Sequence, residues 1–220
     1  MGTMITAHSG SDGTPDNSME YVHHALSCGA DAFEIDVRRN TAGEFYLSHD
    51  QLDGAGPRLR QVFALLKESS MRLNCDLKEE GLERGILALA EECGVLEQII
   101  LSGSVSPLCV KEEPRVRRCT YLNLEMVFPG AMERYRRQEV PLAEEIQAAA
   151  CACRECGVET VNVYYPFCTE KALELFRKYG IGVSVWTVNE REEACRFLKS
   201  GIANITTRKP NMVLSLRNGL

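Results

Sequence analysis

The sequence predicts an α/β protein of the (β/α)8, or TIM, barrel class, with a short excursion after the second strand. Short apolar runs alternate with amphipathic segments from one end of the 220 residues to the other. Eight such repeats fit a compact barrel, whereas a doubly wound sheet would normally use fewer strands. Five glycines follow amphipathic segments at points where a helix favours a left-handed C-terminal cap: Gly29, Gly94, Gly157, Gly180 and Gly201.

The first half of the chain supplies four of the expected strands. Short apolar runs predict them at residues 4–8, 32–38, 72–78 and 98–101. Apolar side chains at helical spacing predict the intervening helices at 17–28, 59–69 and 82–93. Residues 45–49 follow the turn signal Asn40-Thr41-Ala42-Gly43, so a short extra strand is expected there as the excursion.

The second half repeats the same rhythm after a shorter helical pattern at 105–111. Four further apolar runs predict strands at 119–125, 160–164, 182–187 and 203–206. Helical spacing predicts the helices at 142–156, 169–179 and 190–199. No linker rich in Pro, Gly or Ser divides the chain, so residues 1–220 are expected to form one domain.

The composition limits the classes of partner. The chain has 25 basic and 31 acidic residues, a net charge of −6. Sequence-independent binding to nucleic acid requires a basic footprint, so no nucleic-acid partner is expected, whereas a small anionic substrate remains compatible. No apolar run approaches the roughly 20 residues of a membrane-spanning helix, so no stable membrane insertion is expected and we place the chain in the cytoplasm. The sequence does not predict the oligomeric state.

The cysteines are interpreted as structural. Ten cysteines in 220 residues are too few for a disulfide scaffold. Cys151, Cys153 and Cys156 form the densest group, but helical spacing directs their thiols around the helix instead of toward one ion. We therefore expect small, mostly buried apolar side chains and no zinc site.

Polar residues gather at the carboxyl ends of the first three predicted strands. In a (β/α)8 barrel these ends and the loops after them face one shared cavity. Because alternate residues of a strand face the same side, Glu34 should lie beside Asp36 and Asp76 beside Lys78. The residues at these ends are His8, Glu34, Asp36, Asp76 and Lys78, and His49 and Asp50 join them from the close of the excursion.

These residue types predict a metal-assisted acid–base site. Glu34, Asp36 and Asp76 would repel one another in a cavity, and a hard divalent cation, Mg²⁺ or Ca²⁺, would offset that repulsion. Pairing of Glu34 or Asp36 with Arg38, Arg39 or Lys78 is the alternative explanation. His8 and His49 are candidate acid and base because imidazole titrates near neutral pH, and Lys78 is a candidate for offsetting charge on an anion. The set meets the needs of phosphoryl transfer.

The order of short motifs along the chain resembles the glycerophosphodiester phosphodiesterase family. The motifs are His8-Ser9-Gly10, Pro15-Asp16-Asn17-Ser18, Glu34-Ile35-Asp36, His49-Asp50, Asp76-Leu77-Lys78, Trp186-Thr187-Val188-Asn189 and Gly201-Ile202-Ala203-Asn204-Ile205-Thr206-Thr207. This resemblance spans almost the whole chain. It implies a TIM barrel, a Mg²⁺ or Ca²⁺ ion, two histidines as general acid and base, and hydrolysis of a small-molecule glycerophosphodiester to glycerol 3-phosphate and an alcohol.

Position by position, the resemblance implies roles for individual residues. His8 and His49 match the catalytic pair, Glu34 and Asp36 the first metal ligands, and Lys78 a catalytic, phosphate-facing lysine. Asp76 stands where the family usually has a glutamate as third ligand, and Glu125 is a candidate to assist it. Trp186 matches an aromatic wall beside the glycerol moiety, although it also suits a large core residue.

The chain departs from the family pattern at two further places. Ser9 replaces an arginine that usually contacts phosphate, so it is the substrate-binding candidate at that position although a hydroxyl cannot reproduce a guanidinium. Asn204 and Thr207 stand where acidic residues are usual.

Several alternatives stay open at this stage. One is a barrel that binds a phosphorylated ligand without turnover, and another is a phospholipase-like enzyme acting on lipid headgroups. The assignment of acid and base to the two histidines, and the choice between direct attack by water and a cyclic phosphate intermediate, are also open.

Overall fold

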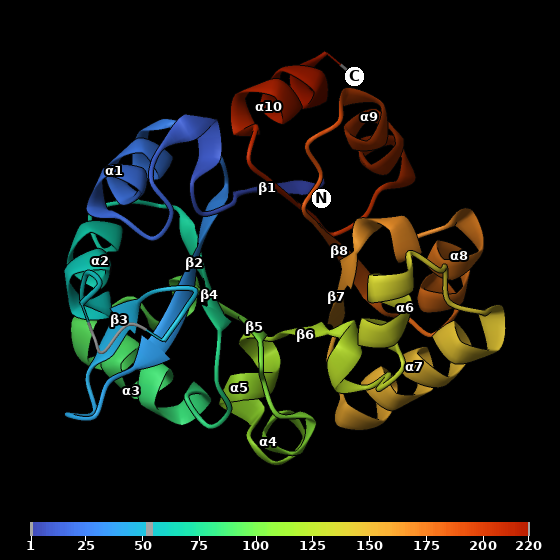
Figure 1. Cartoon of the computed structure of the whole chain (residues 1–220), viewed down its shortest axis with the longest axis horizontal. Coiled ribbons are helices and arrows are strands. Elements are labelled where there is room, and N and C mark those ends of the chain that lie inside the picture. Colours follow the sequence, from blue (N-terminus) through green and yellow to red (C-terminus); the bar gives the residue numbers. More distant parts are fainter. Residues whose placement is uncertain (1, 52–54, 220) are drawn as a thin grey trace.

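The computed structural model describes residues 2–51 and 55–219, in which eight parallel strands form a ring with the helices outside it (Figure 1). The ring strands are Met4–Ala7 (β1), Ala32–Arg39 (β2), Arg72–Leu77 (β4), Ile99–Gly103 (β5), Tyr121–Asn123 (β6), Thr160–Tyr164 (β7), Gly182–Trp186 (β8) and Asn204–Thr207 (β9). A short strand, Phe45–Leu47 (β3), lies outside the ring and pairs antiparallel with β2. The predicted barrel and its excursion after the second strand are confirmed.

The ring is nearly closed, and its weakest seam lies between β5 and β6. Hydrogen-bonded neighbours follow the order β5, β4, β2, β1, β9, β8, β7, β6. A single parallel bridge, Leu101 to Thr120, joins the two ends of this series. The backbone N–H of Gly103 also donates to Oδ1 of Asn123 at 3.2 Å across the seam. The carboxyl ends of all eight strands therefore surround one opening.

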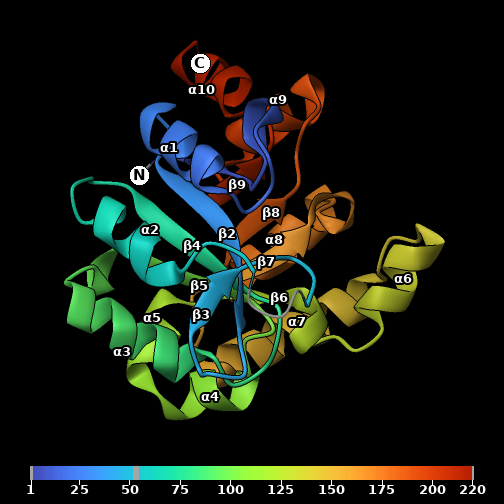
Figure 2. The same ribbon diagram turned by 60° about the vertical axis from the view of Figure 1, so that its left-hand side comes forward.

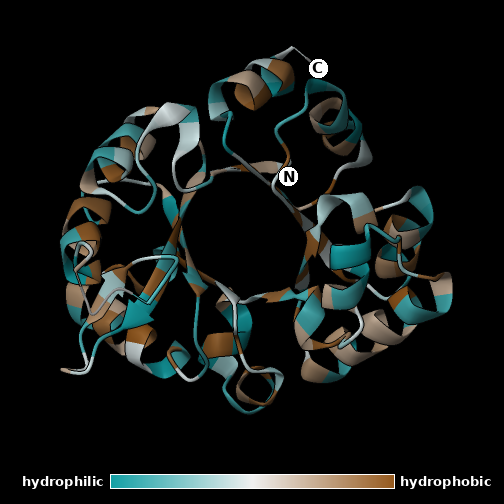
Figure 3. Ribbon diagram, in the orientation of Figure 1, coloured by the Kyte–Doolittle hydropathy of each residue, from teal (hydrophilic) through white to brown (hydrophobic). Residues whose placement is uncertain are grey.

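The helices cover the outside of the ring. Hydrophobic and hydrophilic residues alternate along them (Figure 3), as expected for helices with one buried face. The α-helices are Met19–Ser27 (α1), Leu59–Leu66 (α2), Glu83–Cys93 (α3), Pro107–Glu112 (α4), Pro114–Cys119 (α5), Ala131–Arg137 (α6), Ala143–Cys156 (α7), Glu170–Lys178 (α8), Arg191–Ser200 (α9) and Pro210–Asn218 (α10). Short 3-10 helices are Ser11–Gly13 (η1), Leu96–Gln98 (η2), Leu124–Met126 (η3) and Tyr165–Phe167 (η4).

The alternation of β2 shows how the ring separates its core from its opening. Phe33, Ile35 and Val37 are fully buried on the outer face of the strand, within the core shared with the helices. The intervening residues, Glu34 and Asp36, line the cavity inside the ring. The apolar core and the polar interior are thus encoded by the two faces of the same strand.

Local signals explain most helix boundaries. All five glycines predicted to end helices have positive φ, at 63° to 80°. The first helix begins later than predicted because Ser18 caps it, accepting a hydrogen bond from the backbone N–H of Tyr21 at 3.0 Å. Asn17, placed in that helix by the pattern, instead has a φ of 52° in the loop before it.

Four details of the predicted elements were wrong. The helix expected at 105–111 is α4, but a second helix that was not predicted, α5, follows it after the break at Glu113 and begins at Pro114. The strand expected at 119–125 is only Tyr121–Asn123, since the chain turns into η3 at Leu124. Neither α6 nor α10 was predicted: α6 is short and buries little, and α10 starts at a proline, Pro210. No helix among the described residues is both long and apolar enough to cross a membrane.

Candidate active site

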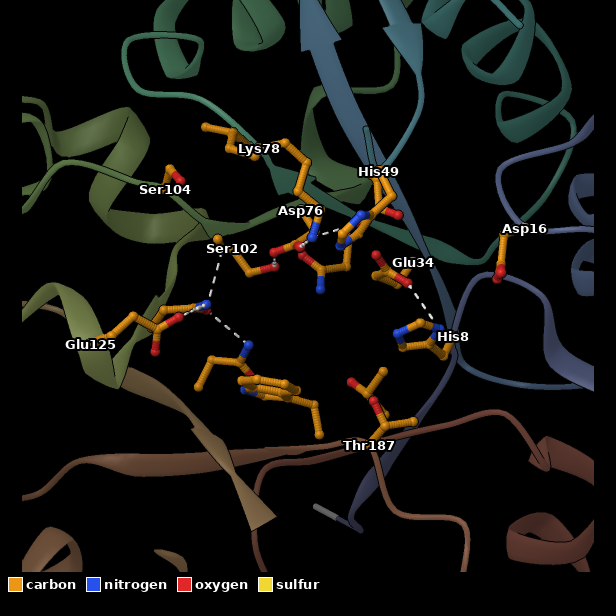
Figure 4. Close-up of a pocket in the computed structure, with 18 of the residues that line it drawn as sticks. His8, Asp16, Glu34, His49, Asp76, Lys78, Ser102, Ser104, Glu125 and Thr187 are labelled. Carbon is orange, nitrogen blue, oxygen red and sulfur yellow. Dashed lines mark hydrogen bonds and ion pairs between the residues drawn. The ribbon is translucent and has the colours of Figure 1, made fainter. Parts of the chain in front are cut away.

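A cavity of about 560 Å³ opens inside the ring at the carboxyl ends of the strands (Figure 4). Its wall brings together nearly all of the residues that the sequence singled out. Seven of them line it: His8, Glu34, Asp36, His49, Asp76, Lys78 and Trp186. Glu125, the candidate for assisting the metal ligands, lines it as well.

Three carboxylates converge on one side of this cavity. β2 and β4 are paired in register, so Asp36 lies opposite Asp76, and Glu34 precedes Asp36 by one inward position. One oxygen from each of the three side chains lies within 4.8 Å of the other two. Glu34 and Asp36 are buried and Asp76 is half-buried. The cluster therefore concentrates negative charge where little water can screen it.

Lys78 partly compensates this charge. Its ammonium Nζ lies 2.8 Å from Oδ1 of Asp36 and 2.5 Å from Oδ2 of Asp76. Burial acts to lower the pKa of Lys78, but the two neighbouring carboxylates outweigh it and raise the pKa well above its ordinary value. The ion pair between Asp36 and Lys78, which the sequence analysis gave as the alternative to a bound cation, is therefore present in the structure. One positive charge still faces three acidic side chains.

The surroundings make the carboxyl groups of Glu34 and Asp36 unequal. Burial and the charges of Asp36 and Asp76 raise the pKa of Glu34 well above its usual range. Burial also opposes ionisation of Asp36, yet Lys78 and a hydrogen bond from Asn17 leave its pKa lowered. Asn17 holds Asp36 twice, donating from Nδ2 to Oδ2 at 2.6 Å and accepting the Asp36 backbone N–H at 2.9 Å. Asn17 is therefore a positioning residue that the sequence analysis missed.

His8 presents one ring nitrogen to the cavity. Its Nδ1 lies 2.7 Å from the backbone carbonyl of Ser9, which only accepts hydrogen bonds, so Nδ1 carries the proton and Nε2 has a free lone pair. Burial lowers the pKa of His8, the Ser9 carbonyl opposes this change, and the positive charge of Arg208 adds to the lowering. His8 is therefore neutral at pH 7.

His49 lies at the open rim of the cavity. Residues 45–47 form β3, and the chain then turns so that the backbone carbonyl of His49 accepts hydrogen bonds from Nε and Nη2 of Arg38, at 3.0 and 2.8 Å. Its Nδ1 lies 3.0 Å from Oδ1 of Asp50. The side chain is 70% exposed, in contrast to 24% for His8. The two histidines thus occupy an inner and an outer position.

Ser9 does not reach the cavity, so its assignment as a substrate-binding residue is not supported. The residue is 1% exposed, and its hydroxyl accepts the backbone N–H of Asn17 at 2.7 Å. Its own backbone N–H donates to Oε2 of Glu34 at 2.9 Å. The physical reason is that the small hydroxyl already has a hydrogen-bond partner in the adjacent loop and does not extend into the cavity. Ser9 therefore orders the first loop and the acidic cluster.

Arg208 brings a guanidinium to the same rim from the opposite end of the chain. It follows β9 directly, and its backbone N–H donates to Oδ1 of Asn189 at 2.9 Å. Its Nη2 lies 2.9 Å from Oδ1 of Asp16, and both side chains line the cavity. These side chains are 42% and 55% exposed, so their ion pair is screened and weak. The motif analysis included Asp16 but gave no role to either residue.

The other half of the wall is neutral. Four side chains from β6 to β9 form a continuous series of hydrogen bonds, each 2.9 Å long, that links Asn123, Asn162, Ser184 and Asn204. The series continues to β1, where the hydroxyl of Thr6 donates to Oδ1 of Asn204 at 2.7 Å. Asn204, which departs from the family pattern, is therefore a buried link in this network.

Trp186 and Glu125 border the neutral half at the end of β8 and in η3. The Trp186 ring lies 5.6 Å from the ring of Tyr164, measured between centroids. Oε1 of Glu125 accepts a hydrogen bond from Nδ2 of Asn123 at 2.8 Å, and burial raises the pKa of Glu125. Glu125 lies across the cavity from Glu34 in Figure 4, so it is not part of the carboxylate cluster.

The acidic cluster fits a divalent cation. Its donors are all oxygens, which suit Mg²⁺ or Ca²⁺ better than a soft ion. Oδ1 of Asn74, a buried cavity-lining oxygen in register with Glu34, has no hydrogen-bond donor among the described residues. Ser102 donates to Oδ1 of Asp76 at 2.9 Å and orients that carboxylate. The arrangement combines a possible cation site with a neutral imidazole, an exposed imidazole and two permanent cations.

Comparison with known proteins gives relatives over nearly the full length. No family model matches the chain. The glycerophosphodiester phosphodiesterase of Caldanaerobacter subterraneus is 21% identical to it, over 98% of this chain and 98% of the relative.

Two solved structures have the same fold. A glycerophosphodiester phosphodiesterase from Parabacteroides distasonis aligns with a TM-score of 0.76 at 15% identity, over 99% of this chain and 98% of that chain. A phosphodiesterase from Oleispira antarctica aligns with a TM-score of 0.72 at 18% identity, over 99% of this chain and 97% of that chain. The latter structure is a complex with the product sn-glycerol 3-phosphate.

Proposed function

We propose that this chain, which belongs to the glycerophosphodiester phosphodiesterase family by its full-length similarity to known members, hydrolyses a small glycerophosphodiester to glycerol 3-phosphate and an alcohol. The observation that carries this proposal is the convergence of three carboxylates and two histidines in one cavity. The product bound to the Oleispira relative supports the choice of substrate class. The proposal treats residues 1–220 as one catalytic domain.

Glu34, Asp36 and Asp76 are the proposed ligands of a Mg²⁺ or Ca²⁺ ion. A bound divalent cation supplies charge stabilisation at a phosphate oxygen. Lys78 bridges two of the same carboxylates, so its ammonium must move aside or share them when the cation is bound. In either position Lys78 remains beside the cluster, where it offsets charge on the phosphoryl group.

His8 is the proposed general base. Its Nε2 lone pair is available because Nδ1 donates to the Ser9 carbonyl, and its lowered pKa keeps the ring neutral at pH 7. His8 takes a proton from the attacking oxygen, which belongs to water or to a substrate hydroxyl that first forms a cyclic phosphate. The new bond joins that oxygen to phosphorus.

His49 is the proposed general acid. Its exposed position at the rim is where the alcohol would leave. Nδ1 is held by Asp50, so Nε2 is the free ring nitrogen, and it is the proton donor when the ring is in its protonated, imidazolium form. The bond from phosphorus to the alcohol oxygen breaks, and that oxygen receives the proton of His49. The inner and outer positions of the two rings thus support an assignment that the sequence left open.

Arg208 is the proposed phosphate-binding guanidinium. Lys78 and Arg208 are the two permanently charged cations among the described residues that line the cavity. Lys78 is held by two carboxylates, whereas Arg208 is held by one exposed carboxylate, Asp16. A planar guanidinium binds two phosphate oxygens at once, and the diester would replace Asp16 as its partner.

The test is hydrolysis of glycerophosphocholine with Mg²⁺ or Ca²⁺, with and without a chelator, by the wild type and by His8→Ala and His49→Ala. We expect chelator-sensitive release of glycerol 3-phosphate and loss of that release in both variants. His23→Ala is the matched control, since His23 is exposed on α1 and lines no described cavity. Binding without turnover across a wider panel of phosphodiesters would instead identify a non-catalytic binding protein.

We also propose a cytoplasmic location. All ten cysteines are unpaired thiols, as is usual in a reducing compartment. Several are only partly buried, so the expectation that they act mainly as buried apolar side chains holds for Cys75, Cys153 and Cys168. Fractionation of the native cells, followed by immunodetection of the protein, tests the location.

A further inference from the structure

Arg38 continues the inward face of β2 beyond its two carboxylates. Glu34, Asp36 and Arg38 are alternate residues of the strand, so their side chains leave it on the same side. The sequence analysis considered Arg38 as an ion-pair partner of these acids. In the structure Lys78 pairs with Asp36, while the guanidinium of Arg38 donates to the backbone carbonyl of His49. The positive charge of Arg38 is therefore directed at the segment that carries the outer histidine.

Two N–H groups of this guanidinium bind one carbonyl oxygen. Nε and Nη2 of Arg38 lie 3.0 and 2.8 Å from the backbone oxygen of His49. The guanidinium is planar and its donors have a fixed geometry, so two such hydrogen bonds set the direction of the contact as well as its length. A charged donor also makes a stronger hydrogen bond than a neutral one. Arg38 therefore holds the backbone of His49 against the end of β2.

The other contacts of this segment hold the residues next to His49. β3 pairs antiparallel with β2 and lies beside it in both views (Figures 1 and 2). Ser48 follows β3, and its backbone N–H donates to the carbonyl of Asp36 at 3.1 Å while its hydroxyl donates to the carbonyl of Asp50 at 2.7 Å. The side chains of His49 and Asp50 are 70% and 81% exposed, so water screens the contact between them. Arg38 is thus the described residue through which β2 holds His49 itself.

One strand therefore connects the carboxylate cluster with the outer histidine. Glu34 and Asp36 are the cluster residues of β2, and Arg38 stands two residues further along the same face. We propose that Arg38 is a positioning residue that fixes the imidazole of His49 relative to the diester bound at the carboxylates, an inference that rests on the proposed phosphodiesterase function. Arg38 does not line the cavity, so it acts through His49 and not by contact with the substrate.

The first experiment compares two leaving groups. Choline needs a proton on its oxygen as the bond from that oxygen to phosphorus breaks, whereas 4-nitrophenol is a far stronger acid and leaves as the phenolate without one. Arg38→Met should lower kcat for glycerophosphocholine roughly 10- to 100-fold, because the proton donor is misplaced. For the 4-nitrophenyl ester of glycerol 3-phosphate, kcat should stay within roughly threefold of the wild type, because general acid catalysis is not needed.

Three further variants locate the effect. His49→Ala should show the same dependence on the leaving group, with a larger loss for glycerophosphocholine because the proton donor itself is removed. Arg38→Lys keeps a charged donor but not the planar fork, so it should recover part of the kcat that Arg38→Met loses. Arg39→Met is the matched control, since Arg39 is the next residue of β2, is exposed and points to the opposite face of the strand.

A second experiment separates this inference from the proposed function. Hydrogen exchange of the backbone N–H groups in residues 46–50 reports how firmly the segment is held, with or without turnover. Exchange should be roughly tenfold faster in Arg38→Met than in the wild type, since the segment opens more often once the contact with His49 is lost. Arg39→Met should exchange like the wild type. If the wild type hydrolyses neither substrate, the proposed function fails, and the exchange rates still decide whether Arg38 positions His49.

Three results would overturn the inference. One is an unchanged kcat for glycerophosphocholine in Arg38→Met while His49→Ala loses turnover, which would leave the proposed function intact. Another is an equal loss of kcat for both substrates in Arg38→Met, which would show a general structural role. The third is hydrogen exchange in residues 46–50 that Arg38→Met leaves at the wild-type rate.

Discussion

The two halves of the barrel interior satisfy their polar groups in opposite ways. From β6 to β9, amides and hydroxyls donate and accept among themselves, so that Asn162 both donates to Asn123 and accepts from Ser184. On β2 and β4, three acidic side chains face one another, and Lys78 is the cation that touches two of them. The hydrogen-bond series of the neutral half carries no net charge, whereas the acidic half retains an excess of negative charge.

This difference separates stability from function. A hydrogen-bonded network without net charge stabilises the fold at any metal concentration. Clustered buried carboxylates destabilise the fold unless a cation compensates them, so their presence indicates selection for chemistry. Changes in the acidic half should therefore alter turnover more than stability, and changes in the neutral half should do the reverse.

The largest expected effect is at the edge of the acidic half. His8→Gln should lower kcat roughly 10²- to 10⁴-fold, since it removes the general base while keeping a polar side chain of similar reach. Steady-state kinetics on glycerophosphocholine measures this change. A decrease below tenfold would assign the base to another group.

The pH profile of the wild type sharpens the same assignment. His8 must be neutral to accept a proton, and burial together with Arg208 lowers its pKa below the ordinary value of 6.5. The acid limb of the kcat/KM profile, where activity is lost as the pH falls and the ring becomes protonated, should therefore have its midpoint below pH 6.5. A midpoint of the acid limb above pH 6.5 would contradict the lowered pKa of His8.

Removal of one carboxylate charge gives the next effect. Glu34→Gln should lower turnover roughly 10²- to 10³-fold, because a cation that stabilises transition-state charge is held less well. Its Tm in metal-free buffer should equal or exceed that of the wild type, since repulsion with Asp36 and Asp76 is relieved. Glu144→Gln on the exposed surface of α7 is the control, and a large fall in metal-free Tm would show that Glu34 has a structural role instead.

Much of this contrast is predictable from the sequence. Strand alternation places Glu34 and Asp36 on one face and Phe33, Ile35 and Val37 on the other, and parallel strands bring their carboxyl ends together. The alternation of residues along a strand does not predict the geometry of the loops. The burial of Ser9 depends on the left-handed backbone at Asn17, and the position of Arg208 depends on a contact with Asp16 that is distant in sequence.

The aromatic contacts of α6, from Tyr135 to Tyr164 and from there to Trp186, were also outside the reach of sequence patterns. α6 has one buried residue, Ala131, so it shows no apolar stripe from which a helix could be predicted. Its aromatic partners, Tyr164 and Trp186, belong to two different strands. Their meeting is a property of the closed ring and of the order in which its strands are paired.

A smaller effect is expected at the cationic rim. Arg208→Gln should raise KM roughly 10- to 100-fold with a lesser change in kcat, as is typical when a charged hydrogen bond to substrate is lost. Arg136→Gln is the matched control, because Arg136 is exposed on α6 and does not line the cavity. An unchanged KM in Arg208→Gln would exclude a role in binding phosphate.

The smallest effect on turnover is expected in the neutral half. Ser184→Ala removes the hydroxyl that donates to Asn162 and accepts from Asn204. Oδ1 of Asn162 is then buried without a donor, while Nδ2 of Asn204 keeps one acceptor, Thr206. The free energy of unfolding should fall by about 1–3 kcal/mol, measured by urea denaturation. Ser200→Ala on α9 is the control. If folded Ser184→Ala lost as much turnover as the variants of the acidic half, the assignment of stability to one half and function to the other would be wrong.

The most direct measurement is a crystal structure grown with Ca²⁺. The account predicts one ion bound by oxygens of Glu34, Asp36 and Asp76 at roughly 2.3–2.6 Å, with the ammonium of Lys78 displaced from between Asp36 and Asp76. The account would be contradicted by a structure at saturating Ca²⁺ in which Lys78 still bridges the two aspartates and no ion is bound at the three carboxylates.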